Sequence, residues 1–393
     1  MKTKPTEDLD QKTLALMHKN RQRPLCPCQT PGIEMYIAKI GDQYIIKRMP
    51  NTGSLHSTDC ESYEPPAELS GLGDMLGSAI KEDADEGVTE LRFDFSLAKV
   101  AGRGAPQKSD DDDTSSVRTY GSRLTLRSTL HYLWEEAGFN RWTPAMAGKR
   151  NWAVMRKHLL LAAENKIAKG APLTEQMYIP EFFSVDRKDT ILQNRHTQFK
   201  WLRSSTASNK MMILIGELKE ILPSRFGHKL VIKHCADLPF LINDDLHKRL
   251  LKRYFSELDL WDTFEDMHLV IVGTFGLNAA NIPILDELSL MATTANWMPF
   301  ESIYDKAIID KMTEEKRRFI KGLRYNLPGS KPLASTVLTD THPLATALYA
   351  IPIEPTEGYL AELKSLIEGS RLAASQWDTS EYEIPELPPA TPG

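Results

Sequence analysis

Three of the four cysteines in this 393-residue chain lie within its first 60 residues. Cys26 and Cys28 are separated by one residue, and His56 and Cys60 form a second pair separated by three. Thiolates and imidazoles are the ligands with which Zn²⁺ builds closed tetrahedral sites, and clustered cysteines in a reducing compartment indicate a metal sooner than a disulfide. The pattern therefore predicts a structural site with Zn²⁺ as the cofactor, bound by Cys26, Cys28, His56 and Cys60.

A β-hairpin is predicted between the two halves of this site. Two β-rich runs within residues 35–48 are joined by Gly41 and Asp42, and glycine supplies the positive φ that a tight turn needs. Because zinc ribbons carry their ligands at the ends of such a hairpin, residues 1–100 are expected to form a small zinc-ribbon-like module with an extra strand over 91–97. The alternatives are three unrelated cysteines with an exposed histidine, a redox or catalytic cysteine, and a weaker mixed site that includes Asp42 and Asp59.

The composition excludes several classes of protein. Hydrophobic residues make up 41% and charged residues 26% of the chain, which is ordinary for a globular protein. No apolar run approaches the roughly 20 residues of a membrane helix, and the polar start lacks a signal-peptide core. A net charge of -5 argues against a globally basic coat for nucleic acid. We therefore expect a cytoplasmic protein with no membrane partner.

A basic helical segment is predicted over residues 119–205. Between residues 121 and 160 the chain has seven lysines or arginines and two acids, and tryptophans alternate with them near the expected helix ends. Such a mixture can contact phosphates and stack on bases, so DNA or a nucleoprotein complex is a possible partner. The alternative is a helical pair with buried tryptophans and a solvated basic face. The predicted nucleic-acid contacts are Arg141, Trp142, Lys149, Arg150 and Arg156.

The remaining chain predicts a mixed-sheet α/β domain over residues 206–375, so the fold class is α+β or mixed α/β. Apolar runs predict strands at 211–220, 229–235, 268–275, 318–325, 335–339 and 346–351. Helices are expected at 246–258, 284–291, 300–312 and 359–370. A linker is predicted at 101–118, which includes the acidic run 110–113, and a proline-rich tail at 376–393, with disorder expected over 383–393. Cys235 is expected to be buried in its strand.

The search for catalytic motifs leaves only weak candidates. The chain has no phosphate-binding loop, dinucleotide fingerprint or His-Glu-x-x-His motif, and no small-molecule cofactor is evident. Glu217 and Lys219 form an acid-x-lysine unit of the kind that metal-dependent nucleases use, although alternating charges on a strand more often mark a solvent face. Glu301 is the third candidate.

The C-terminal order of a helix, three strands and a helix resembles a degenerate restriction-endonuclease-like core. That family has an acid leading into its second strand, where this chain has residues 333–335 without one. It also has an acid-x-lysine on the third strand, where residues 347–349 read Ala-Leu-Tyr. If the likeness holds, the nuclease centre is missing or relocated, and a structural or DNA-positioning version fits better.

Three features together resemble a bacterial family, domain of unknown function 1173, over nearly the full length. They are the N-terminal cysteines Cys26, Cys28 and Cys60, the block from 130 to 142 (LHYLWEEAGFNRW), and the block from 318 to 328 (RFIKGLRYNLP). The resemblance implies a bacterial protein found on plasmids or other mobile elements, with no established activity. The expected function is a zinc-binding accessory protein that binds nucleic acid or a partner complex without catalysis. The alternatives are a metal-dependent nuclease and a protein-binding scaffold.

Overall fold

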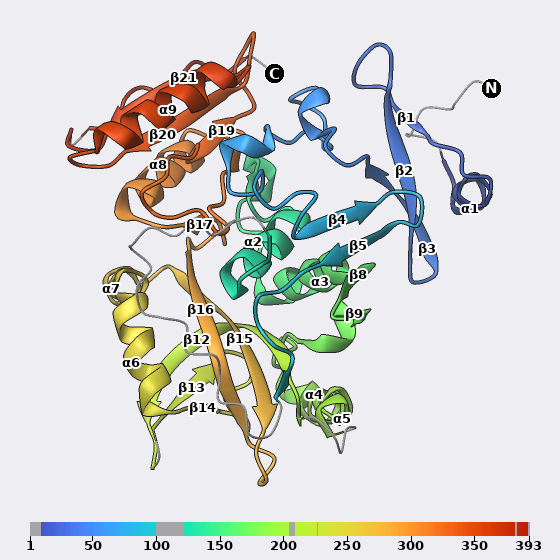
Figure 1. Cartoon of the computed structure of the whole chain (residues 1–393), viewed down its shortest axis with the longest axis vertical. Helices are drawn as coiled ribbons and strands as arrows, with labels where there is room; N and C mark the ends of the chain where they lie inside the picture. The colour runs from blue at the N-terminus through green and yellow to red at the C-terminus, as the bar shows by residue number, and fades with distance from the viewer. Residues whose placement is uncertain (1–8, 100–121, 204–208, 226, 382, 392–393) are drawn as a thin grey trace.

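The computed structural model describes residues 9–99, 122–203, 209–225, 227–381 and 383–391, and its elements are labelled in Figure 1. Within these residues the fold mixes α-helices with five β-sheets. The linker predicted at 101–118, with its acidic run, lies outside the described residues. No helix in the described ranges is long and apolar enough to cross a membrane.

The predicted N-terminal hairpin is confirmed. Strands β2 (Ile33–Ile40) and β3 (Gln43–Arg48) pair antiparallel around Gly41, whose φ is +56°. Strand β1 (Leu25–Cys26) adds to the other edge of β2. Helix α1 (Gln11–Lys19) packs on this sheet through a small apolar cluster, so the module has little core of its own. The members of that cluster are Leu14, Met17 and Ile37, with Leu9, Tyr44 and Ile46 at its edge.

The helical segment is built into neighbouring sheets. Helices α2 (Leu126–Glu136) and α3 (Trp152–Ala163) begin at Thr125 and Asn151, whose side chains accept hydrogen bonds from backbone N–H groups of the first turn. Short strands of this segment pair with strands from other parts of the chain. They are β7 (Arg141–Trp142), which pairs with β18 (Phe319–Lys321), β8 (Lys166–Ala168), which pairs with β5 (Val88–Leu91), and β10 (Met177–Tyr178), which pairs with β12 (Met212–Pro223).

Further strands and two helices complete this part of the fold. Strand β5 also pairs with β4 (Ile80–Asp83), and β9 (Ala171–Pro172) extends the same sheet beyond β8. Strands β6 (Ala98–Lys99) and β11 (Asn209–Lys210) form a two-stranded sheet. Helices α4 (Lys188–Gln198) and α5 (Lys200–Arg203) lead into β11.

A small closed β-barrel follows, lower in the view of Figure 1. Its five strands run in the ring order β12, β13 (His228–Ile232), β14 (Phe240–Ile242), β16 (Pro283–Thr293) and β15 (His268–Leu277), and β15 closes the ring on β12. The first half of β12 pairs with β15 and its second half with β13, across an irregularity between Leu218 and Glu220. Numbered along the chain, the ring reads first, second, third, fifth, fourth. This is the strand order of the OB fold, a five-stranded Greek-key barrel.

The barrel closes because small residues let its strands approach each other. A Cβ atom at Gly216 would lie 2.6 Å from Cγ2 of Ile232, so no larger residue fits where β12 curves from one partner to the other. Side chains of β12 alternate between the barrel interior, as Leu214 does, and the core beneath α2 and α3, as Ile213 does. The helix predicted at 284–291 is wrong, because this segment is strand β16 and pairs with β15 along its length.

Helices α6 (Asp244–Arg253) and α7 (Phe255–Thr263) connect the third and fourth strands of the barrel. Helix α6 confirms the amphipathic pattern predicted there, since Leu246 and Leu250 are buried in the barrel core. Strand β17 (Pro299–Phe300) pairs antiparallel with the last two residues of β16.

The C-terminal region is a sheet between two helices. Its order is β21 (Ala373–Asp378), β20 (Thr346–Ile351), β19 (Thr336–Leu338), β18 and β7, with only the β20–β21 pair parallel. Helix α8 (Ile303–Glu314) packs on the face that carries Phe319, Leu338 and Leu348, and α9 (Glu357–Gly369) packs on the opposite face. These strands and helices confirm the predicted α/β content of this part.

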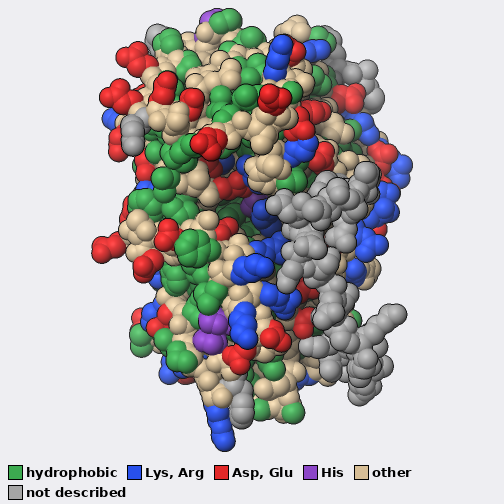
Figure 2. All heavy atoms as spheres, turned by 60° about the vertical axis from the view of Figure 1, so that its left-hand side comes forward, with side chains coloured by type: hydrophobic (Ala, Val, Ile, Leu, Met, Phe, Trp, Pro, Cys, Tyr) green, Lys and Arg blue, Asp and Glu red, His purple; other side chains and the backbone are tan. Residues whose placement is uncertain are grey.

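The proline-rich tail differs from the predicted disorder over the residues described. Strand β21 reaches into it, and Ile384 and Leu387 pack against the main core. The backbone N–H of Thr391 donates to the carbonyl of Asp340. Apolar contacts and a backbone hydrogen bond therefore hold this segment on the fold. Figure 2 turns the left-hand side of Figure 1 toward the viewer, and acidic and basic side chains are both present on the face that it shows.

Candidate metal centre

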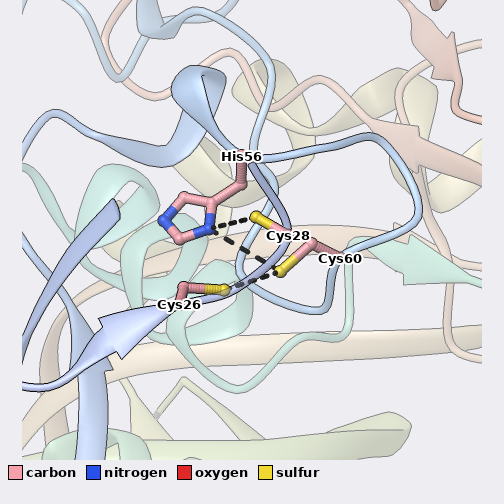
Figure 3. Close-up of side chains that lie close together, drawn as sticks. All are labelled: Cys26, Cys28, His56 and Cys60. Carbon is pink, nitrogen blue, oxygen red and sulfur yellow. Dashed lines mark hydrogen bonds between the residues drawn. The ribbon is translucent and has the colours of Figure 1, made fainter. Parts of the chain in front are cut away.

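The four predicted ligands meet between two loops at the base of the N-terminal hairpin. Cys26 is the last residue of β1, and Cys28 lies in the turn that follows it. His56 ends the short 3₁₀ helix Gly53–Leu55, and Cys60 lies in the next turn, where its N–H donates to the carbonyl of Ser57. The hairpin thus brings the loop before β2 and the loop after β3 together, with all four side chains pointing inward (Figure 3).

The distances match the edges of a tetrahedral metal site. All four ligand atoms lie within 4.8 Å of one another. The Sγ atoms of Cys26 and Cys60 are 3.6 Å apart, and Nδ1 of His56 is 3.3 Å from Sγ of Cys28 and 3.6 Å from Sγ of Cys60. With Zn–S bonds of about 2.3 Å and Zn–N bonds of about 2.0 Å, a tetrahedron has S···S edges of about 3.8 Å and S···N edges of about 3.5 Å. One ion therefore fits the ligand set.

The protonation states of the ligands are suited to a cation. Burial raises the pKa of the Cys26 thiol to about 12, which leaves this thiol neutral unless a positive charge replaces its proton. Burial also lowers the pKa of His56, so its imidazole is neutral and Nδ1 can ligate. A bound divalent ion deprotonates coordinating thiols and would supply that charge.

Contacts outside the ligand set hold the two loops in place. The N–H of Ser62 donates to Sγ of Cys60 at 3.4 Å, which supports a thiolate there. Nη2 of Arg318 lies 2.6 Å from a carboxylate oxygen of Asp59, so the second loop is tied to the residue that precedes β18. Asp59 is thus engaged by an arginine, and Asp42 lies in the turn at the other end of the hairpin. Four protein ligands leave no open position for substrate, as in structural sites.

Each of the three weak catalytic candidates has different partners, and no contact joins one candidate to another among the residues described. Glu217 is buried, with its carboxylate 2.6 Å from Nζ of Lys233 and 2.7 Å from Nδ1 of His268. Lys219 is exposed and 4.0 Å from Glu220, whereas Glu301 pairs with Arg324 at 2.6 Å. Among the residues described, the Cys–His cluster is the one group of three or more possible ligands close enough to share an ion.

Glu217 joins three strands at the place where β12 changes partners. Lys233 follows β13 and His268 begins β15, and their distance from Glu217 along the chain leaves no sequence pattern that identifies them as its partners. Burial alone would raise the pKa of Glu217, but hydrogen bonds from His268 and Lys233 outweigh it and hold the pKa below its ordinary value. The folded state therefore favours the ionised carboxylate.

Replacing Glu217 by glutamine is expected to lower the free energy of unfolding by about 2 kcal/mol at pH 7, because Lys233 loses its opposite charge and His268 loses a carboxylate hydrogen-bond partner. Since folding lowers this pKa, the contribution is complete above the unfolded value of about 4.3 and is lost as the pH falls through the folded value. Urea unfolding at pH 7 and at pH 3 measures both effects. Glu220→Gln, a change at a half-exposed residue near the same strand pair, serves as the control, and equal losses in the two variants would contradict this role.

The predicted nucleic-acid residues of the helical segment mostly support the fold. Trp142 is 1% exposed, and Arg141 donates to the carbonyl of Tyr63. Arg150 donates to the carbonyls of Gly138, Phe139, Arg141 and Asn296, and burial lowers its pKa to about 10. Nε of Arg156 donates to the carbonyl of Ile179 at 3.0 Å. For the three arginines, the predicted contact with nucleic acid would compete with these internal bonds, and Trp142 is buried. Lys149 alone of the five is exposed.

Cys235 is buried in the barrel core, as the sequence predicts, just after β13. Its Sγ lies 3.4 Å from the hydroxyl of Tyr178 and 3.0 Å from Nη1 of Arg195. Burial raises the pKa of this thiol. The fourth cysteine is thus a packing residue at a distance from the metal centre along the chain.

Comparison of the chain with curated proteins and with solved structures gave no match. A family described as "Protein of unknown function (DUF1173)" matches residues 2–380, which is nearly the whole chain. This match covers the Cys–His cluster, the barrel and the C-terminal sheet together. The chain belongs to the DUF1173 family.

Proposed function

We propose that this protein is a zinc-binding accessory protein of bacterial mobile elements that binds nucleic acid, alone or within a nucleoprotein complex, and catalyses no reaction. The observation that carries the proposal is the closed barrel with the OB strand order. Barrels of this order commonly bind oligonucleotides or oligosaccharides. The mobile-element setting rests on the family resemblance alone, and fold by itself does not determine function.

Zinc is the metal that fits the site best under this proposal. Three thiolates and one imidazole favour Zn²⁺ over hard cations such as Mg²⁺ or Ca²⁺, which prefer oxygen ligands. The ligand loops lie at the base of a three-stranded antiparallel sheet, an arrangement similar to a zinc ribbon. The metal then has a structural role, and the binding surface lies elsewhere on the chain.

Purified protein is expected to bind fluorescein-labelled oligonucleotides in an anisotropy titration, with an affinity that falls steeply with salt. About four phosphate contacts to a single strand give a slope of about -2.8 in log K against log salt, so affinity drops about 50-fold between 50 and 200 mM NaCl. Binding that is absent at 50 mM NaCl would contradict the proposal and would leave a protein-binding scaffold as the better account.

A metal-dependent nuclease is the second candidate, and the C-terminal sheet favours it. The order α8, β18, β19, β20, α9, β21 and the single parallel pair at β20–β21 are similar to a restriction-endonuclease-like core. Where that core carries carboxylates, however, this chain has buried Ala334, Ala347 and Tyr349. The centre would have to be relocated, for example to Glu301. Cleavage of the same oligonucleotides in Mg²⁺ or Mn²⁺ that is lost in Glu217→Ala or Glu301→Ala would favour the nuclease.

A further inference from the structure

Helix α6 presents a strongly basic face on the barrel. Lys248, Arg249, Lys252 and Arg253, here called the α6 basic face, are all exposed. No ion pair joins any of these four side chains to another residue in the part of the chain described. Their charge is therefore not neutralised by the fold. In a chain of net charge -5, such a local excess of cations indicates an anionic partner.

The position of α6 on the barrel is fixed by its opposite side. Leu246, Leu250 and Tyr254 are buried in the barrel core, and the hydroxyl of Tyr254 donates to the carbonyl of Leu288 on β16 at 3.3 Å. The ring of His247 stacks on that of His228, with centroids 3.5 Å apart and planes 14° apart. Because His228 begins β13, the α6 basic face adjoins the loop between the first two strands of the barrel, a loop through which OB barrels bind ligands.

Two exposed apolar side chains lie beside these cations. Phe255 is 68% exposed and Leu251 is 46% exposed, directly after and within α6. An exposed aromatic ring next to lysines and arginines is what single-strand binding surfaces use, since bases stack on the ring while the cations contact phosphates. On the side of the molecule that Figure 2 shows, lysine and arginine side chains gather near the middle, and histidine side chains lie lower in the view. Exposed acids flank these cations on both sides, because Asp244 and Asp245 begin α6 and Asp259 and Asp262 of α7 lie beyond Phe255. The cationic surface is therefore limited to the part of α6 from Lys248 to Arg253.

We infer that the α6 basic face, with Phe255, is the site at which this protein binds single-stranded nucleic acid. The inference rests on the proposed function and names its surface and its ligand. A single strand fits better than a duplex because its bases are free to stack on Phe255, whereas a duplex hides them. DNA and RNA share the phosphates and the stacking faces, so both are candidates for the same surface.

The test compares two double charge reversals that change the net charge equally. Lys248→Glu/Lys252→Glu alters the α6 basic face, and Lys149→Glu/Lys157→Glu alters exposed lysines of the helical segment. Each is titrated against fluorescein-labelled dT20, rU20 and a 20-base-pair duplex at 50 mM NaCl. The first variant is expected to lose at least tenfold in affinity for the single strands, and to reduce the magnitude of the salt slope by about 1.4. The second is expected to change affinity less than twofold.

Phe255→Ala is expected to weaken single-strand binding about tenfold at unchanged salt slope, because it removes stacking and no charge. The wild type is expected to bind the single strands at least tenfold more tightly than the duplex, and comparison of dT20 with rU20 shows which strand is preferred. Equal losses in the two double variants, a larger loss in the Lys149 variant, or a preference for duplex would overturn the inference while leaving the proposed function standing. A wild type that binds no oligonucleotide would overturn both.

Discussion

Replacing Cys60 by serine is expected to release the zinc proposed for the Cys–His cluster and to lower the free energy of unfolding of the N-terminal module by at least about 5 kcal/mol. The apparent binding energy of structural zinc is about 10–16 kcal/mol, and in a module with little other core it becomes folding energy. Here the three-stranded sheet and α1 share only a small apolar cluster. A thermal melt with and without a chelator, together with limited proteolysis, measures the effect.

The loss of structure in Cys60→Ser is expected to be confined to the N-terminal module. Cleavage is predicted to concentrate between β1 and the loop that carries Cys60, while the barrel and the C-terminal sheet resist the protease because they share a large buried core. Ser54→Ala, an exposed change in the same loop, is the control and should melt as the wild type does. A Cys60→Ser protein that melts with the wild type and ignores the chelator would show that the site carries no structural metal.

The second large effect is expected from Asp340→Ala, which should cost about 3–5 kcal/mol. Arg317 and Asp340 are 6% and 7% exposed in their side chains, and the carboxylate accepts from Nε and Nη2 of Arg317 at 3.1 and 2.8 Å. It also accepts from the backbone N–H of Arg318 at 2.7 Å, at the start of β18. Removing one member of a buried pair leaves the other charge unpaired in a poorly solvated position. The urea midpoint, at an unchanged m-value, measures the loss.

Two further variants test whether the loss of stability comes from leaving the charge of Arg317 buried and unpaired. Arg317→Met with Asp340→Ala removes both charges and should recover more than half of the loss, because an apolar pair needs no partner. Glu368→Ala breaks the exposed pair with Lys364 and should cost less than about 1 kcal/mol. A double variant as unstable as Asp340→Ala alone would contradict the account.

Local features of the fold could be predicted from the sequence. The hairpin between β2 and β3 follows from Gly41 in a turn between two β-rich runs, and the four ligands follow from the types of residue that bind zinc. Helices α6 and α9 follow from their apolar spacing and capping residues. In each case the information lies within a short stretch of chain. The domain boundaries stay a prediction, although several strand pairs cross them.

The barrel could not be predicted because its closure depends on distant partners. Strand β16 has leucine, glutamate and methionine, which favour helices, and only the long pairing with β15 settles it as a strand. The parallel contact between β14 and β16 joins segments separated by two helices. Similarly, an arginine that binds backbone carbonyls, such as Arg150, has the same sequence signature as one that contacts phosphate. The exposed cations of α6 have the spacing of any amphipathic helix, so the sequence alone does not distinguish them from a solvated face.

The measurement that tests the central claim most directly is the metal content of the purified protein. Elemental analysis is expected to find one zinc per chain in the wild type and in Cys235→Ser, whose cysteine lies outside the cluster. Cys28→Ser and Cys60→Ser, each of which removes a ligand, are expected to contain little or no zinc. A wild type without zinc or any other metal, or a Cys60→Ser variant that retains one zinc per chain, would contradict the account.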